Sequence, residues 1–452
     1  MSDPLDLQGL AHLCEHIMLP LNKQYCDGNY FDTYILQNDG STNASTGLDY
    51  TNFYFDINAE ILEEALDKFV HCFLKPKFID SIIEQEIEAI HCEFEDNLLN
   101  DDWRLEQFDK SSANTKHPYS FFNIGNRESL ETIPRIKKID VRQELINFYN
   151  KWYSANIMSL CVLGKENIDK LEKIISKLFI KVKNKNIEAP KWIEHPFNEE
   201  HFQYKWYIVP IYNTRQLSVT FPIPDIDEYY RSCPTIYLSY LFGHEGKGSL
   251  ISVLREKNLC TSLNCGKSQP GKGFAFFSFE ILLTEKGIDY IDEIIELIFQ
   301  YINMLKKVGP TQWIFNEYVS MQTMNFNNPN FFLPISHVRE VAHDMQEYPI
   351  EEILSAPYFL TKWEPNLINL IIHYLKPQNI RVKIMAQDFE NITTEVEPWY
   401  KIKFEKLKIP ENIIEQWNNA GDNCNFKLPD KNELIPFEIA LKLDTTSVFL
   451  NF

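Results

Sequence analysis

The chain has 452 residues, enough for about three domains of ordinary size or for fewer, larger ones, and its 44% apolar content is sufficient for packed cores. Its 64 acidic residues against 44 basic ones give a net charge of −20, which argues against nucleic acid as a partner. No run of 18 apolar residues predicts a membrane span, and the first ten residues, MSDPLDLQGL, lack the basic and apolar regions of a signal peptide.

The first 182 residues are predicted to form one α/β unit. In TNFYFDIN, the alternation of Phe53, Phe55 and Ile57 is typical of a half-buried strand. The expected elements, in chain order, are a strand at 51–58, a helix at 60–74, a long helix from Ser81 to Lys110, a buried strand at 156–164 and a helix at 165–179. Strands and helices are therefore mixed throughout this unit.

A polar segment with two prolines, at 183–197, is predicted to link the first unit to a second α/β unit at 198–452. The elements expected in the second unit are strands at 204–211, 217–224, 273–283 and 379–387, and an amphipathic helix at 290–309 with Gly309 as its C-cap. The mixture of strands and helices in both units predicts an α+β fold made of two related α/β sandwiches.

The nine cysteines are scattered along the chain, and no two of them form a CxxC pair. This pattern favours reduced thiols over a disulfide framework or a thiol-rich metal site. We therefore expect a cytoplasmic protein, with a mitochondrial or peroxisomal pool as the alternative.

The segment GLAHLCEHIMLP, at 9–20, contains His12, Glu15 and His16. Histidines at positions i and i+4 of a helix lie on one face, so both rings can reach one zinc ion. Glu15 lies close enough to take a proton from a zinc-bound water and to pass it to a leaving amine. This HxxEH order is the inverted form of the HExxH signature of zinc peptidases. The alternative is that so short a pattern is only a solvated helix face.

A catalytic zinc also needs a third protein ligand and one open position. Glu86 and Glu93 are seven residues apart, almost two helical turns, so their carboxylates share a face beside an apolar stripe. Burying a carboxylate beside apolar residues is costly unless it is paired or bound to a metal. Their position is explained if Glu93 binds the metal and Glu86 accepts a hydrogen bond from another ligand. The alternative is that both carboxylates are exposed and ordinary.

Ten segments of the chain occur in the order and spacing of one known family. They are GLAHLCEH, DGSTNASTGLDYTNFYFDI, ALDKFVHCFLKPKF, EIEAIHCEFEDNLLNDDWR, KHPYSFFNIGN and KWYSANIMSLCVLG in the first unit, and EEHFQYKWYIVPI, LSVTFPIPD, GHEGKGSLIS and FKLPDKNELIP in the second. Through them the chain resembles the N-terminal half of the insulinase (insulin-degrading-enzyme, pitrilysin-like) zinc metallopeptidases. The resemblance covers nearly all 452 residues and is strongest for the insulin-degrading branch.

The resemblance implies that His12, His16 and Glu93 bind one zinc ion and that Glu15 is the catalytic base. Glu86 matches the acid that orients one of the ligand histidines. The first unit would then be the peptidase domain, and the second would be a non-catalytic domain that anchors the substrate.

The resemblance also implies where a peptide substrate binds. STNAST matches the edge strand along which the substrate lies as an added β-strand. The implied contacts are Asn43 and Ala44 on that strand, Tyr54 and Trp103 around the cleaved bond, and Leu263, Cys265 and Lys267 at the N-terminal end of the substrate.

Two further residues have alternative interpretations. His244 matches the substrate-anchoring surface, although a structural histidine near the start of a helix is the simpler interpretation. Cys14, inside the zinc motif, is either a small buried residue or the cause of sensitivity to thiol reagents.

The chain departs from the family in pocket residues and in length. Aromatic pocket positions of the insulin-degrading branch are Leu19, Ser45 and Glu106 here, so its cleavage preference does not carry over. Members of that branch are about twice as long, and their four domains form two bowl-shaped halves around a closed chamber. They also have three strands before the segment at which this chain starts, so we expect an exposed sheet edge or an unstable first domain. A truncated product, an alternative isoform or an incomplete gene model would explain both differences.

The leading hypothesis is a zinc metalloendopeptidase that degrades small to medium peptides. The main alternative is a catalytically weak, peptide-binding or regulatory half-protein whose partner is a C-terminal-half chain or a second copy of itself. In the family, the other half of the protein supplies groups that hold the scissile carbonyl in the transition state. Loss of such groups typically costs about 100- to 1000-fold in turnover. A non-catalytic core subunit of a mitochondrial complex is a third interpretation. It is disfavoured because such relatives commonly lose the zinc ligands that this chain keeps.

Overall fold

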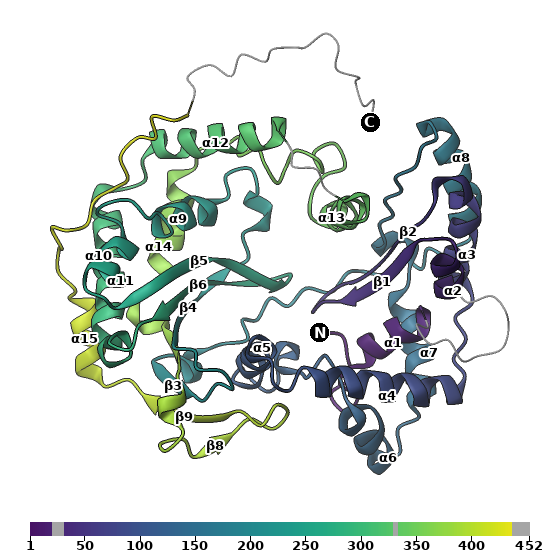
Figure 1. Cartoon of the computed structure of the whole chain (residues 1–452), viewed down its shortest axis with the longest axis horizontal. Helices are drawn as coiled ribbons and strands as arrows, with labels where there is room; N and C mark the ends of the chain where they lie inside the picture. The colour runs from purple at the N-terminus through teal and green to yellow at the C-terminus, as the bar shows by residue number, and fades with distance from the viewer. Residues whose placement is uncertain (20–30, 329–332, 436–452) are drawn as a thin grey trace, which may run out of the picture.

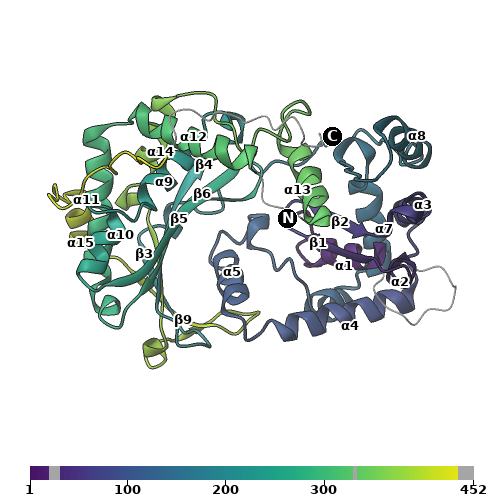
Figure 2. The same ribbon diagram turned by 45° about the horizontal axis from the view of Figure 1, so that its top comes forward.

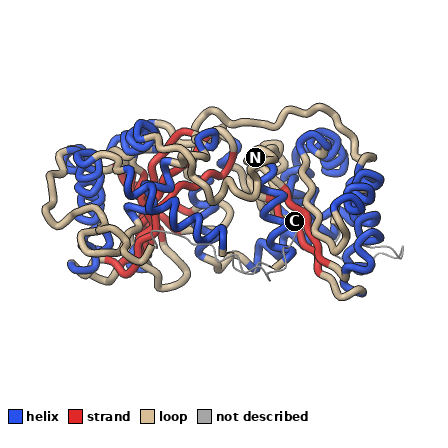
Figure 3. Tube along the Cα trace, turned by 90° about the horizontal axis from the view of Figure 1, so that it is seen from above, coloured by secondary structure: helices blue, strands red, loops and turns tan. Residues whose placement is uncertain are grey.

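The computed structural model describes residues 1–19, 31–328 and 333–435 of the chain. The described residues have an α+β fold. The end of the expected second unit, 436–452, lies outside the described residues. Two groups of strands, each with its own helices, lie side by side along the long axis (Figures 1 and 3). We call residues 1–182 the first part and residues 198–435 the second part. Among the described residues, no helix is long and apolar enough to cross a membrane.

The first part consists of helices around one antiparallel hairpin. Its elements are α1 (Leu10–Met18), α2 (Phe31–Gln37), β1 (Ser41–Thr46), β2 (Thr51–Asp56), α3 (Leu62–Leu74), α4 (Asp80–Asp96), α5 (Asp101–Ser111), α6 (Ile133–Lys137), α7 (Val141–Trp152) and α8 (Ile168–Phe179). β1 pairs with β2 from Ser41 opposite Asp56 to Thr46 opposite Thr51. The inward rings of β2 pack on α3, where the Phe53 and Phe73 ring centroids are 5.2 Å apart. The apolar alternation of β2 therefore places the hairpin on the helical core.

The long helix expected from Ser81 to Lys110 is two helices, so that prediction was wrong in this detail. α4 ends at Asp96, and α5 begins at Asp101. The side chain of Asn100 accepts hydrogen bonds from the backbone N–H groups of Asp102 and Trp103 at 2.9 and 3.5 Å. Such an N-cap satisfies donors that a continuous helix would have used internally, so it starts a new helix in a new direction.

The buried strand expected at 156–164 is also absent. Residues 155–157 form a single 3-10 turn, and residues 159–163 make no backbone hydrogen bond within the described part of the chain. A strand exists only beside a neighbour, and the nearest candidate, β2, pairs with β1 alone. An apolar groove of about 570 Å³ separates β2 from this segment. The other side of β2 therefore pairs with no strand among the described residues.

The second part is a mixed sheet covered by helices. Its strands are β3 (Tyr204–Ile208), β4 (Gln216–Pro224), β5 (Cys260–Gly271), β6 (Phe274–Leu283), β7 (Arg381–Met385), β8 (Glu395–Val396) and β9 (Lys403–Lys408). Its helices are α9 (Pro234–Phe242), α10 (Leu250–Glu256), α11 (Ile291–Val308), α12 (Gln312–Asn327), α13 (Pro334–Glu347), α14 (Pro365–Tyr374) and α15 (Glu411–Asn418). The strand order is β5-β6-β4-β7-β3-β9-β8, and only β3 and β7 are parallel neighbours.

The two parts meet where α5 lies against the sheet of the second part. Phe122 stacks on Trp399 with ring centroids 4.2 Å apart, within an apolar cluster that draws residues from both parts. Nearby, Lys383 of β7 binds Asp109 of α5 at 2.5 Å. A second contact is made by α13, which lies beside β2 (Figure 2). The helix that follows α4 is therefore anchored on the second part.

Replacing Phe122 by alanine tests this anchoring. Phe122 is fully buried, and removing a buried phenylalanine ring typically lowers the free energy of unfolding by about 3–5 kcal/mol. We expect Phe122→Ala to show a loss of that size in chemical denaturation. The control is Ile193→Ala, because the side chain of Ile193 is 85% exposed. A loss below about 1 kcal/mol, ordinary for many substitutions, would show that the two parts do not rely on this cluster.

Candidate metal centre

Two of the candidate ligands lie on the short helix α1, and two features hold the N-terminus of this helix in place. Asp3 accepts hydrogen bonds from the backbone N–H groups of Gly9 and Ala11 at 2.7 and 2.9 Å, which satisfies donors at the helix N-terminus. Gly9 has a φ of 94°, and a Cβ there would lie 2.5 Å from the Cα of Gly125. Glycine is therefore required at this position, and it brings α1 against the backbone near Ile124.

Three candidate ligand side chains converge from α1 and α4. The Nε2 atoms of His12 and His16 are 3.3 Å apart. Oε2 of Glu93 lies 3.7 Å from His12 Nε2, and Oε1 of Glu93 lies 3.7 Å from His16 Nε2. Two donors of one tetrahedral zinc ion, each about 2.0–2.1 Å from it, are about 3.3 Å apart. The spacing of the two rings matches that value. Two imidazoles and one carboxylate are also a donor set that zinc accepts, so these residues fit the ion.

The far side of each imidazole is held by a hydrogen bond. His16 Nδ1 contacts Glu86 Oε2 at 3.0 Å, and His12 Nδ1 contacts the backbone oxygen of Ile124 at 2.7 Å. Both partners are acceptors, so each Nδ1 carries a proton, and in the neutral rings each Nε2 is the nitrogen left to bind a metal. Glu86 is only 2% exposed. Its contact with His16 gives this buried carboxylate a polar partner.

The protonation of the centre follows from burial and from the nearby charges. Burial and the charge of His16 lower the pKa of His12 to about 4, so His12 is neutral at physiological pH. Burial also disfavours protonated His16, but the hydrogen bond with Glu86 and the carboxylate of Glu93 outweigh it and raise the pKa of His16. Burial raises the pKa of Glu15, and a hydrogen bond from Thr46 partly opposes that shift. A carboxylate with a raised pKa suits a group that must both accept and release a proton.

The proposed contacts in the first part lie on β1, β2 and α5. Asn43 and Ala44 are on β1, whose outer edge pairs with no strand among the described residues. The Tyr54 ring is covered by the guanidinium of Arg339 from α13, 5.5 Å away. Trp103 is 39% exposed in the first turn of α5. These side chains do not belong to the His12–His16–Glu93 cluster.

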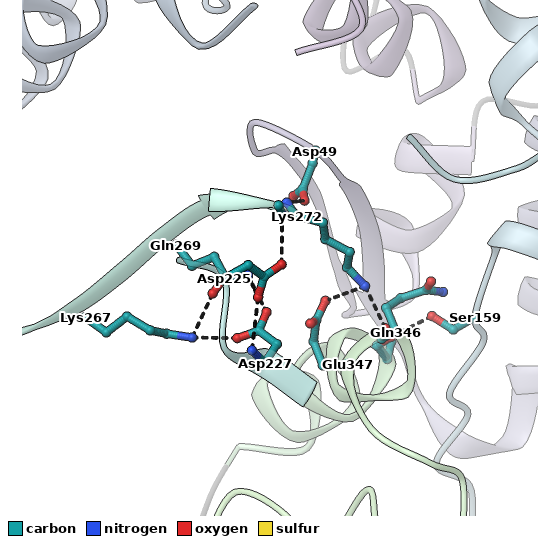
Figure 4. A network of polar contacts seen from close by, with 11 residues as sticks. Asp49, Ser159, Asp225, Asp227, Lys267, Gln269, Lys272, Gln346 and Glu347 are labelled. Carbon is teal, nitrogen blue, oxygen red and sulfur yellow. Dashed lines mark hydrogen bonds and ion pairs between the residues drawn. The ribbon is translucent and has the colours of Figure 1, made fainter. Parts of the chain in front are cut away.

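The proposed contacts in the second part lie on β5, at the edge of the large sheet. Leu263 is buried in the core, so only its backbone is available to a peptide. Cys265 is half-buried against the backbone of Ser239. Lys267 binds Asp227 at 2.5 Å and Gln269 at 2.8 Å, within a polar network that extends to the β1–β2 turn and α13 (Figure 4).

The remaining candidates are largely structural. Burial raises the pKa of the Cys14 thiol to about 12, which disfavours the thiolate form that reacts with thiol reagents. The eight cysteines of the described chain are all unpaired, and Cys26 lies outside it. His244 lies in the loop after α9, where its ring packs over Gly246. Thr46, which contacts Glu15, was missed by sequence reasoning, because a threonine at the end of a strand has no distinguishing signal.

Comparison with known proteins follows the same division of the chain. The family model for insulinase (peptidase family M16) matches residues 1–116. The models for the peptidase M16 inactive domain and for the middle or third domain of peptidase M16 match residues 140–321 and 290–448. The range with the inverted zinc motif and the range with the large sheet thus both match models of one class of metallopeptidase. The chain belongs to the insulinase (M16) family of peptidases.

Individual relatives agree with this assignment. The chain is 43% identical to human insulin-degrading enzyme over 441 residues, which is 97% of this chain and 43% of the human protein. It is 38% identical to the A-factor-processing enzyme of Saccharomyces cerevisiae over 96% of this chain and 42% of that protein. The crystal structure of pitrilysin shares the fold, with a TM-score of 0.89 at 24% identity over 97% of this chain and 46% of that one. The chain thus spans less than half the length of these relatives.

Zinc analysis of three variants tests the ligand assignment. Glu93→Gln should lower bound zinc well below one ion per chain, because a neutral amide replaces a ligand carboxylate. Glu15→Gln should leave the zinc content near that of the unaltered chain, because Glu15 is not a ligand. Glu95→Gln is the matched control, two residues further along α4, with a side chain 59% exposed. Equal zinc loss in Glu93→Gln and Glu15→Gln, measured by elemental analysis, would contradict the assignment.

Proposed function

We propose that this chain is a zinc metalloendopeptidase that cleaves small to medium peptides. The observation that carries the proposal is the convergence of His12, His16 and Glu93, with Glu15 beside them on α1. In this proposal the chain has two related α/β sandwich domains. Residues 1–182 form the peptidase domain, 183–197 the linker and 198–452 a domain that anchors the substrate without taking part in the chemistry.

The chain's own residues divide the chemical work. One zinc ion bound by His12, His16 and Glu93 would supply a Lewis acid that activates water and polarises a carbonyl group. Glu15 takes the proton of the attacking water and delivers it to the amine nitrogen that leaves when the peptide bond breaks. Glu86 and the backbone of Ile124 keep the two imidazoles turned toward the metal throughout.

The substrate is proposed to bind as an extended peptide. The free edge of β1 can accept it as an added strand, with Asn43 and Ala44 contacting its backbone. Tyr54 and Trp103 would line the space around the scissile bond. Leu263, Cys265 and Lys267 would hold the N-terminal end of the peptide along β5, which is also an edge strand among the described residues.

A second candidate function is that of one half of a two-part peptidase. Because the chain spans 43% of human insulin-degrading enzyme, a partner half could supply groups that hold the scissile carbonyl. The chain would then be a peptide-binding or regulatory half-protein, with a turnover lower by about 100- to 1000-fold when it acts alone. Its partner would be a C-terminal-half chain or a second copy of itself. The unpaired thiols of the described chain favour a cytoplasmic location for either function.

Hydrolysis of an internally quenched fluorescent peptide distinguishes the two functions. We expect the zinc-loaded chain to cleave the peptide and Glu15→Gln to lose at least about 100-fold in kcat, as expected when an acid–base group is removed. Cleavage should also stop when zinc is chelated and return when zinc is restored. A folded, zinc-loaded chain that binds the peptide without cleaving it would overturn the self-sufficient peptidase and favour the half-protein.

A further inference from the structure

The hydroxyl of Thr46 is hydrogen-bonded to the carboxylate of Glu15. Thr46 is the last residue of β1, and its Oγ1 donates to Oε2 of Glu15 on α1. Glu15 is only 7% exposed, and its other oxygen, Oε1, accepts no hydrogen bond from the described residues. A buried carboxylate needs at least one donor to stay in place. Thr46 supplies that donor and leaves Oε1 free.

Thr46 is itself held by a second hydroxyl. Its Oγ1 lies 3.1 Å from Oγ1 of Thr51, its partner across the hairpin. The single proton of Thr46 goes to Glu15, so the contact between the threonines must use the proton of Thr51. The two hydroxyls therefore connect the carboxylate of Glu15 to both strands of the hairpin.

We propose that Thr46, held by Thr51, is the positioning residue of the base Glu15. It fixes one carboxylate oxygen so that the other faces the attacking water when the peptide is cleaved. This inference rests on the proposed peptidase function and extends it. Thr46 does not touch the metal ligands or the substrate's reacting atoms; it acts through Glu15.

The position of Thr46 on β1 gives the contact a second consequence. The strand whose free edge is proposed to receive the peptide also carries the group that holds the base. Any shift of β1 relative to α1 would therefore move Oε1 away from the scissile bond.

Kinetics of three variants test the proposal. Thr46→Val keeps the shape of the side chain and removes the hydroxyl, so kcat should fall by about 10- to 100-fold, part of the usual gain from an acid–base group, with KM and zinc content unchanged. Thr46→Ser keeps the hydroxyl and should restore most of kcat. The matched control is Thr220→Val, which removes another strand hydroxyl paired with a hydroxyl, that of Ser278 at 3.1 Å, far along the chain. Unchanged kcat in Thr46→Val, or a rise in KM alone, would overturn the positioning role.

A measurement that needs no turnover separates this inference from the peptidase proposal. The thermal midpoints of the metal-free chain are compared for Thr46→Val, Glu15→Leu and the double variant. Since Glu15→Leu removes the acceptor, adding Thr46→Val should then cost clearly less than it does in the unaltered chain. Additive losses would show that the two side chains do not interact, whether or not the chain cleaves peptides. An inactive chain with coupled losses would overturn the peptidase function and keep the contact.

Discussion

The hydrogen bond between Glu86 and His16 joins α4 to α1, and the candidate metal centre depends on it. α1 is only nine residues long and would not be stable by itself in water. Its histidines form a candidate metal-binding pair because Glu86 and the backbone of Ile124 hold the Nδ1 side of each ring. Glu86 and Glu93 lie on one face of α4, so the helix that orients His16 also brings the third ligand. A single helix–helix contact thus assembles the donor set.

The position of α4 depends in turn on the second part of the chain. The break at residues 97–100 turns the chain into α5, which packs against the large sheet through Lys383 and the cluster around Phe122. On the other side of the centre, the hairpin is fixed by α13 and by the polar network around Lys272 (Figure 4). The second part therefore supports both walls of the site, although the three candidate ligands all lie in the first part.

The sequence located the cluster of His12, His16 and Glu93 better than it located the elements around it. The spacing of His12, Glu15 and His16 and the seven residues between Glu86 and Glu93 depend only on helix geometry, so local pattern was sufficient. The strand expected at 156–164 is absent because a strand depends on a neighbour elsewhere in the chain. The contact between Thr46 and Glu15 joins the end of a strand to a helix 31 residues away in the sequence, so no local sequence pattern predicts it. The α+β class followed from the mixture of patterns, whereas the strand order did not.

The central claim is that two imidazoles and one carboxylate bind zinc in this chain. X-ray absorption at the zinc edge of the loaded chain tests it most directly, because it reports the ligand atoms independently of activity. The account predicts a first shell of nitrogen and oxygen at about 2.0–2.1 Å with outer-shell scattering from two imidazole rings. A sulfur shell at about 2.3 Å, from Cys14 in the motif or from Cys92 beside Glu93, would contradict it.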